Sequence, residues 1–376
     1  MTSINDLKRW RQDLHQIPEI GFKEVETTAY LKKELESLGY NVNKLLDTGV
    51  YVYIDNNKDK TIAFRSDIDA LKLTEETGVS FKSKHFGYMH GCGHDGHMSA
   101  LLGLAKRLKE SNDYPYNYLL IFQPAEELAG GSIGVIKTGI LKKYNVQAIF
   151  GMHLMPDYPK GKICCKEGPL MAQNGELDIT IKGKSAHAGK AHLGVDAVVI
   201  ASEIVNSIQL IVSRELSAFH PTIINIGKMN AGTIRNIVAE DASLEGTVRV
   251  FDENDFKKIQ TEINSIAKAC ELKYGCKVDV KLEADNPPVN NDSKLYQEFL
   301  QVVDKDNYLE VKEPLMLSED YSHYQKEIPG IFFFLGTQTK DNKAGLHTGK
   351  FNFNEDILLK AVDTYYSIAT KIKLGD

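Results

Sequence analysis

Nine consecutive positions, residues 89–97, hold three histidines, one cysteine and one aspartate set between glycines. Glycine lets the backbone turn tightly enough to aim several side chains at one point. Cys92 and His94 are two positions apart, and a thiolate beside an imidazole suits Zn²⁺ or another late divalent metal. We therefore predict a metal site at Cys92 and His94, with His90 and His97 as supporting residues. The alternative is a glycine-rich turn with incidental histidines.

Two adjacent glutamates, Glu126 and Glu127, come shortly after a strongly apolar run. Carboxylates at the end of a buried strand need a compensating cation, and a metal supplies one. Adjacent side chains point in different directions, so one of the two can bind metal while the other moves a proton. The alternative is an exposed acidic turn.

Further residues of ligand type stand at the ends of apolar runs or after loops. His153 ends one such run, His347 follows a polar loop, and Asp67 and Asp69 close another run. Taken singly, each histidine would be interpreted as a satisfied core residue. Open α/β sheets gather their sites at the carboxyl ends of strands. Four such clusters in one chain therefore predict a common site.

The elements that must position these residues alternate along the first part of the chain. Amphipathic helix patterns are separated by short apolar runs of the kind found in strands buried on both faces. This alternation indicates an α/β layer with a largely parallel sheet. The helices are predicted at residues 5–14, 24–38 and 98–108, and the strands at residues 50–54, 61–65, 118–123 and 148–153.

A second region has its own order, which is strand, helix, strand, strand, helix, strand. This is the split, ferredoxin-like arrangement. The strands are predicted at residues 176–182, 222–228, 242–251 and 277–283, and the helices at residues 195–215 and 254–274, the latter capped by Asn254.

After the breaker Asn286-Pro287-Pro288 the first pattern resumes, with helices at residues 294–303 and 354–373 and a strand at residues 331–335. The simplest architecture is a discontinuous α/β domain, residues 1–173 and 289–376, interrupted by a smaller domain at residues 174–288.

Composition excludes several classes of protein. The net charge of −6 over 376 residues gives no reason to expect nucleic acid as a partner. No stretch approaches the ~20 apolar residues that a membrane helix needs, and the charged start of the sequence does not match a signal peptide. Five cysteines without a disulfide pattern complete the expectation of a cytoplasmic protein.

As a set, these motifs resemble the metallopeptidase family that includes aminoacylases, carboxypeptidase G and the plant auxin-conjugate hydrolases. The similarity is greatest to the branch with a cysteine ligand, which contains N-acyl-amino-acid amidohydrolases, hippurate hydrolases and N-acetyldiaminopimelate deacetylases. It also covers residues 11–19 and 318–321. The resemblance implies a three-layer, phosphorylase/hydrolase-like catalytic domain with an inserted ferredoxin-like domain that serves as lid and homodimer interface.

The resemblance also implies roles for individual residues. Two divalent cations, Zn²⁺, Mn²⁺, Co²⁺ or Ni²⁺, would be held by a bridging cysteine and four further ligands, namely Cys92, His94, Glu127, His153 and His347. Glu126 would be the general base and Asp69 a carboxylate that orients a ligand. In the inserted domain, His187 would stabilise the oxyanion, and Asn236 and Arg249 would contact the substrate carboxylate.

The expected activity is hydrolysis of the amide of an N-acyl-L-amino acid, with N-acetyl-L-diaminopimelate as the named candidate. A dipeptidase or carboxypeptidase of the same family is the closest alternative. A metal-binding protein without turnover is a different class, but it would have no use for Glu126 beside Glu127. A metallophosphatase is disfavoured because the sequence has no arginine cluster or phosphate-cradling, glycine-rich loop.

Overall fold

A computed structural model of the protein describes residues 2–111, 113–340 and 343–375. The chain forms two compact units. The first comprises Met1–Leu170, Asn290–Glu313 and Asp320–Asp376, and the second comprises Met171–Val289 together with Pro314–Glu319. No sequence pattern had set this last short segment apart from the C-terminal part of the chain.

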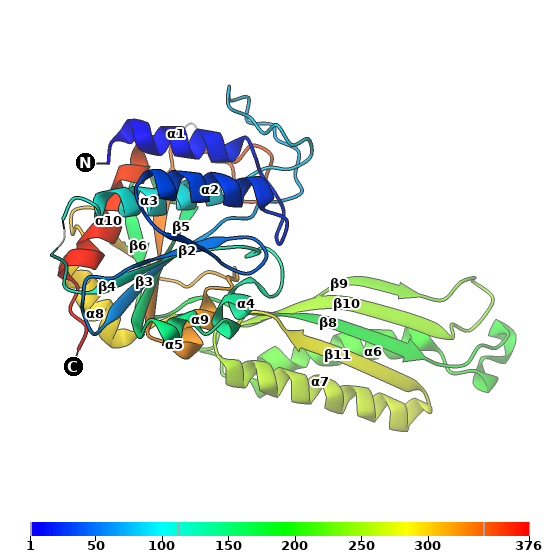
Figure 1. The fold of residues 1–376 in the computed structure, drawn as a ribbon. Helices are drawn as coiled ribbons and strands as arrows, with labels where there is room; N and C mark the ends of the chain where they lie inside the picture. Colours follow the sequence, from blue (N-terminus) through cyan, green and yellow to red (C-terminus); the bar gives the residue numbers. More distant parts are fainter. Residues whose placement is uncertain (1, 112, 341–342, 376) are drawn as a thin grey trace. The chain divides into compact units, whose positions relative to one another are not determined.

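The first unit is built on an eight-stranded mixed sheet, whose central part is seen in Figure 1. The order of its strands is β1-β2-β4-β3-β5-β14-β6-β13. The four central strands, β4, β3, β5 and β14, run parallel, whereas the β1-β2, β2-β4 and β14-β6 pairs are antiparallel. The strands are β1 (Val42–Lys44), β2 (Val50–Ile54), β3 (Thr61–Asp67), β4 (Asn117–Gln123), β5 (Val146–Pro159), β6 (Ile163–Cys165), β13 (Tyr308–Glu310) and β14 (Gly330–Gln338).

Helices cover the sheet of the first unit on both faces. Helices α1, α3 and α10 pack together on one face, and α4, α5 and α9 are grouped on the other (Figure 1). The buried strands β3 and β4 have no exposed residue, as expected for strands covered on both sides. The helices are α1 (Ile4–His15), α2 (Val25–Ser37), α3 (His94–Arg107), α4 (Gly131–Lys137), α5 (Ile140–Lys143), α8 (Ser293–Val302), α9 (Ser322–Glu327) and α10 (Leu358–Lys371), which follows the 3₁₀ turn η3 (Glu355–Ile357). Short strands β7 (Gly168–Met171) and β12 (Val289–Asn291) pair separately.

Strand β5 is longer than the sequence predicted. It continues for six residues beyond His153, so that this histidine lies inside the strand and not at its end. The reason is that β5 has two parallel partners of different length. Pairing with β3 ends at Arg65 opposite Gly151, whereas pairing with β14 continues to Gln338 opposite Pro159.

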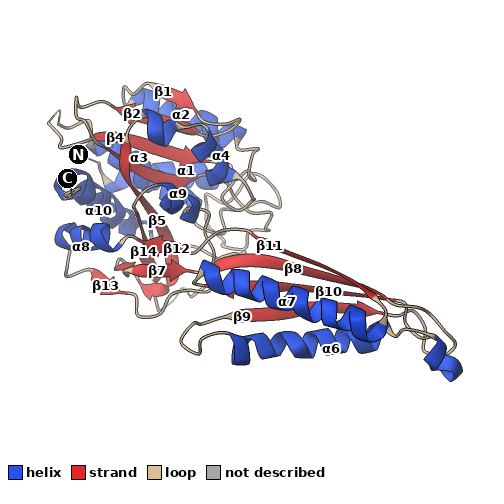
Figure 2. Ribbon diagram, turned by 90° about the horizontal axis from the view of Figure 1, so that it is seen from below, coloured by secondary structure: helices blue, strands red, loops and turns tan. Residues whose placement is uncertain are grey.

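The second unit has the predicted order of elements, namely β8 (Gln173–Lys182), α6 (Ala197–Leu210), β9 (Ile223–Ala231), β10 (Asp241–Val250), α7 (Glu253–Tyr274) and β11 (Lys277–Ala284), with the 3₁₀ turn η1 (Ala188–Leu193) before α6. Its sheet runs β11-β8-β10-β9, and all neighbouring strands are antiparallel. Both long helices lie on one face of the sheet (Figure 2). Asp252, and not the predicted Asn254, caps α7, because its carboxylate accepts the backbone N–H of Asn254.

Helix α6 continues as a π-helical turn, η2 (Ile211–Glu215). Among the described residues, Ala197–Glu215 is the one helix long and apolar enough, by length and composition, to cross a membrane. The sequence analysis had expected no apolar stretch near the length of a membrane helix, and this helix differs from that expectation. The core helix of a soluble protein meets the same criterion of length and hydropathy. A row of small and aliphatic side chains on one face is buried in the core of the second unit, namely Ala197, Ile200, Ala201, Ile204, Ile208 and Ile211.

Candidate metal centre

The parallel strands place the polar residues of the first unit at one edge of its sheet. Asp67 ends β3 and pairs in register with Gln123, which ends β4. Asp69 and the two glutamates follow these strand ends within four residues. The predicted common site is therefore built from the carboxyl ends of adjacent strands, where backbone leaves the sheet and side chains are free to converge.

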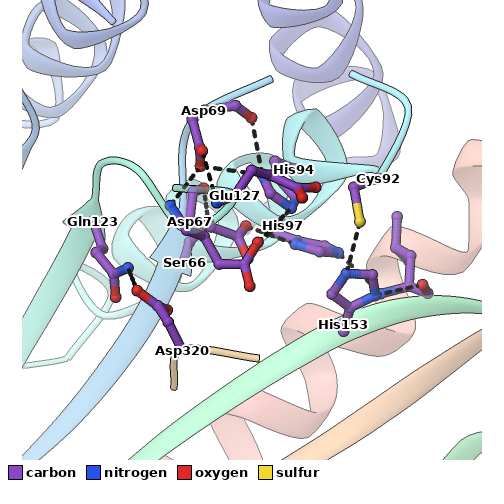
Figure 3. A network of polar contacts seen from close by, with 12 residues as sticks. Ser66, Asp67, Asp69, Cys92, His94, His97, Gln123, Glu127, His153 and Asp320 are labelled. Carbon is purple, nitrogen blue, oxygen red and sulfur yellow. Dashed lines mark hydrogen bonds and ion pairs between the residues drawn. The ribbon is translucent and has the colours of Figure 1, made fainter. Parts of the chain in front are cut away.

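The structure brings together all five side chains that were predicted to bind metal. The Sγ atom of Cys92 lies 3.2 Å from Nε2 of His153 and 3.3 Å from Nε2 of His347 (the contact with His153 is drawn in Figure 3). Nε2 of His347 is also 3.2 Å from Oε1 of Glu127. Two triads that could each hold a cation share Cys92, namely Cys92–His94–His153 and Cys92–Glu127–His347.

Hydrogen bonds fix which ring nitrogen of each buried histidine faces the cluster. Nδ1 of His94 donates to the backbone carbonyl of Asp69 at 2.8 Å, and Nδ1 of His153 donates to that of Leu154 at 2.7 Å. The lone pair of the neutral His153 ring then lies on Nε2, and that of His94 lies on Nε2 once this nitrogen has given up its proton. Metal-binding histidines use this arrangement, in which the outer nitrogen is held by a carbonyl.

An orphaned atom tests whether a cation fits. Nε2 of His94 is buried and has no hydrogen-bond partner among the described residues, which is rare for a buried polar atom unless an ion or water completes it. The sulfur, imidazole and carboxylate donors around it match the ligand types of Zn²⁺ and its neighbours. The residues present therefore fit a divalent metal.

The electrostatics of the site also favour positive charge. Burial alone lowers the pKa of His94, but the nearby carboxylates of Asp67 and Asp69 outweigh it and raise this pKa to about 10. His153 behaves differently. Burial, with His97 close by, holds its pKa well below the usual value, so this ring is neutral and able to act as a ligand.

Asp69 organises the backbone around the glutamates. Its two carboxylate oxygens accept the N–H groups of Glu126 and Glu127, both at 3.0 Å, while its own carbonyl holds His94. Oε2 of Glu126 lies 4.0 Å from Nε2 of His94, and the Glu126 side chain keeps 10% of its surface exposed. Glu126 is therefore beside the cluster and accessible to a small molecule.

A network of buried polar side chains lies next to the ligand cluster and supports it. The sequence analysis did not identify these residues as a connected group. Nε2 of His97 accepts the N–H of Leu154, so its Nδ1 donates to Asp67 at 2.7 Å. Arg65 binds Asp67 at 3.0 Å and Asp320 at 2.5 Å. Gln123 also donates to Asp320, as Figure 3 shows. The sequence signal was weak, because only Arg65 and Asp67 share a strand, while the other members of the network come from segments far apart in the sequence.

We expect Arg65→Met to lower the free energy of unfolding by about 3–5 kcal/mol, because it leaves two buried carboxylates without their shared cation. Urea unfolding of the purified variant measures this. The matched control is Arg9→Met, which removes a half-exposed ion pair with Glu34 and should cost about 1 kcal/mol or less. Equal losses in the two variants would contradict the supporting role of Arg65.

The three residues predicted in the inserted region all belong to the second unit. His187 and Asn236 are exposed, and Nδ1 of His187 accepts the N–H of Gly189 at 3.0 Å. Arg249 is half-buried in β10 and donates to the carbonyl of Met316 at 2.9 Å, within the same unit. The roles predicted for these residues stay predictions.

This α/β unit, whose thiol, imidazole and carboxylate donors converge beside the carboxyl ends of its central strands, has the type of site that metallohydrolases use. The chain belongs to peptidase family M20/M25/M40, whose model matches residues 63–371. The resemblance stated from the motifs is thereby confirmed.

Similar proteins span nearly the whole chain. An N-acetyldiaminopimelate deacetylase of Listeria welshimeri is 38% identical, covering 96% of this chain and 97% of its own. An N-acetyldiaminopimelate deacetylase of a Geobacillus species is 37% identical, covering 98% of this chain and 99% of its own. Among solved structures, the YXEP protein of Bacillus subtilis, named a dinuclear metal binding peptidase of family M20, has a TM-score of 0.85 and 33% identity, covering 97% of both chains.

Proposed function

We propose that this protein hydrolyses the amide bond of N-acyl-L-amino acids, with N-acetyl-L-diaminopimelate as the first candidate substrate. The observation that carries the proposal is the convergence of Cys92, His94, Glu127, His153 and His347 beside Glu126. The names of the Listeria and Geobacillus relatives support the substrate class.

The five converging side chains would hold two divalent cations, with Cys92 shared between both triads. When bound, such cations lower the pKa of water towards neutrality and polarise a carbonyl oxygen. Zn²⁺, Mn²⁺, Co²⁺ and Ni²⁺ all accept this ligand set, so the activating metal is itself part of what must be measured.

Glu126 would act as the general base and then as the general acid. Its carboxylate takes a proton from the attacking water and later delivers it to the departing amine nitrogen. Glu127 has a different task, since its oxygen lies beside His347 within the ligand set. The two neighbouring carboxylates would thus divide proton transfer and metal binding between them.

The second unit would serve as the lid. Because Nδ1 of His187 accepts a backbone N–H, the neutral ring carries its proton on Nε2. That N–H would donate to the oxygen on which negative charge develops. Asn236 and Arg249 would bind the substrate carboxylate, and closure would exclude water from the reacting groups.

We also propose a homodimer through the second unit. Strand β9 is an edge of the four-stranded sheet, and an unpaired edge is a ready template for a second copy. Large apolar side chains on β9 and on the outer face of α6 are 40–57% exposed, namely Val198, Val199, Leu210, Ile223 and Met229. Such surface is typical of an interface. A cytoplasmic location also remains part of the proposal, consistent with the lack of a disulfide among the described residues.

A substrate panel tests the proposed function. N-acetyl, N-benzoyl and dipeptide substrates, with N-acetyl-L-diaminopimelate among them, would be assayed with the metal-free protein reloaded with each of the four metals. We expect kcat/KM to be highest for an N-acyl-amino acid and negligible without metal. Faster cleavage of dipeptides would favour the peptidase alternative, and activity unaffected by chelation would reject both.

A further inference from the structure

Three successive backbone N–H groups at the end of β4 point to buried carboxylates. Asp69 accepts those of Glu126 and Glu127, as described above. The preceding N–H, of Ala125, is accepted by Oε1 of Glu24 at 2.9 Å. Both carboxylates are fully buried. The backbone that carries Glu126 is therefore held from two sides, by residues far apart in the sequence.

Ala125 needs such support because of its conformation. Its φ is +56°, in the left-handed region that residues other than glycine seldom adopt. Successive N–H groups around a left-handed residue form a concavity that binds anions. Here protein carboxylates fill that concavity, so that the turn is fixed before any substrate arrives. We call residues 124–127 the glutamate elbow.

Three glycines pack against the glutamate elbow or the strand end leading to it. A methyl group added at Gly21 would lie 2.9 Å from Cα and Cβ of Ala125. One added at Gly131 would lie 2.4 Å from the carbonyl oxygens of Pro124 and Ala125, and one at Gly49 would lie 2.8 Å from Pro124. The elbow therefore has no space in which to relax.

Glu24 is the N-cap residue of α2, yet its side chain makes no capping hydrogen bond. Its carboxylate instead reaches Thr48, whose hydroxyl donates at 2.6 Å, and Ala125. Burial raises the pKa of this carboxyl group. A carboxylate is expensive to bury, and a glutamine or an apolar residue would be cheaper at a position whose only role is packing. The free N–H groups in the first turn of α2 are instead accepted by Glu19, which binds those of Glu26 and Thr27.

We propose that Glu24 is a positioning residue for catalysis, whose carboxylate fixes the left-handed turn at Ala125 and thereby aims Glu126 at the reacting water and Glu127 at the metal. This inference rests on the proposed function, because it takes Glu126 as the base. Glu24 itself touches neither substrate nor metal. It acts through the backbone of the glutamate elbow, which α2 and β4 hold in place.

The experiment compares Glu24→Ala, Glu24→Gln and Gly21→Ala with the wild-type protein loaded with Zn²⁺. We expect Glu24→Ala to lower kcat by about 10- to 100-fold with KM changed less than about 2-fold, as for other groups that support a catalytic residue from outside. Glu24→Gln should recover most of kcat, since its amide oxygen can still accept the N–H of Ala125. Gly21→Ala should lower kcat without removing a charge.

The matched control is Glu19→Ala, which removes two backbone N–H bonds to a carboxylate at the start of the same helix. It should lower Tm as much as Glu24→Ala but leave kcat near the wild-type value. Wild-type kcat in Glu24→Ala overturns the proposal, as does an equal loss of kcat in Glu19→Ala. If Glu24→Ala does not fold, the kcat of Gly21→Ala tests the proposal in its place. A wild-type kcat in Gly21→Ala then overturns the proposal.

These outcomes separate the positioning role from the proposed function. If Glu126→Gln is inactive while Glu24→Ala has wild-type kcat, only the role of Glu24 is wrong. If Glu126→Gln keeps wild-type kcat, the base assignment is wrong, and the inference about Glu24 is overturned with it.

Discussion

Glu126→Gln is expected to lower kcat by about 10²- to 10⁴-fold, the range usually lost with a general base, while the bound metal stays at the wild-type amount. The physical reason is the separation of tasks between neighbouring glutamates. Oε2 of Glu126 lies 4.0 Å from Nε2 of His94, whereas Oε1 of Glu127 lies 3.2 Å from Nε2 of His347, within the ligand set. Glutamine keeps the size and the backbone bonds to Asp69 but cannot accept a proton.

The control for this prediction is Glu127→Gln, an identical change one position along the same turn. It should lower metal content, because Glu127 belongs to the triad with Cys92 and His347. Steady-state kinetics and elemental analysis on the same samples distinguish the two variants. Near-wild-type turnover by Glu126→Gln, or loss of metal from it, would show that the base has been assigned to the wrong residue.

The second large effect is expected for Cys92→Ala, which should lose most of its bound metal and with it all measurable turnover. Cys92 is the one residue common to both triads, so its removal leaves each of them with two ligands. The metal content after dialysis against metal-free buffer, determined by elemental analysis, measures this.

Cys164→Ala is the matched control for the thiol. Cys164 is also a buried thiol outside any disulfide, but it lies in β6 and belongs to none of the triads described above. Its replacement should leave metal content and kcat unchanged. A full complement of metal in Cys92→Ala would mean that the thiol is not a ligand.

Much of the candidate site could be predicted from the sequence because its ligands lie in short, dense motifs. Cys92 and His94 share one glycine-rich segment, and the two glutamates are adjacent. The end of a parallel strand is visible in sequence as the end of an apolar run, and parallel strands bring such ends to one edge. The family resemblance then assigned His153 and His347 as ligands, although each histidine taken singly would be interpreted as a core residue.

The support of the site could not be predicted in the same way. Glu24 looks like a residue of an amphipathic helix, and nothing in its neighbours indicates a bond to Ala125, 101 positions away. The left-handed φ of Ala125 is equally hidden, because alanine carries no sequence signal for it. Such contacts depend on tertiary packing, which sequence periodicity does not encode.

Similar limits apply to the boundaries of the elements. The length of β5 depends on the partner strand β14, nearly 200 positions later, which continues the pairing after β3 has ended. The order of strands and helices in the second unit was predictable because its alternation of periods 2 and 3.6 is regular. The cap of α7 was misplaced by two residues, since Asp252 and Asn254 are both good capping residues.

The central claim is tested most directly by anomalous diffraction from crystals of the protein loaded with Zn²⁺. We predict two anomalous peaks that both contact Sγ of Cys92, one bound also by His94 and His153 and the other by Glu127 and His347, with Glu126 bound to neither. A single peak, or peaks away from the thiol, would contradict the account.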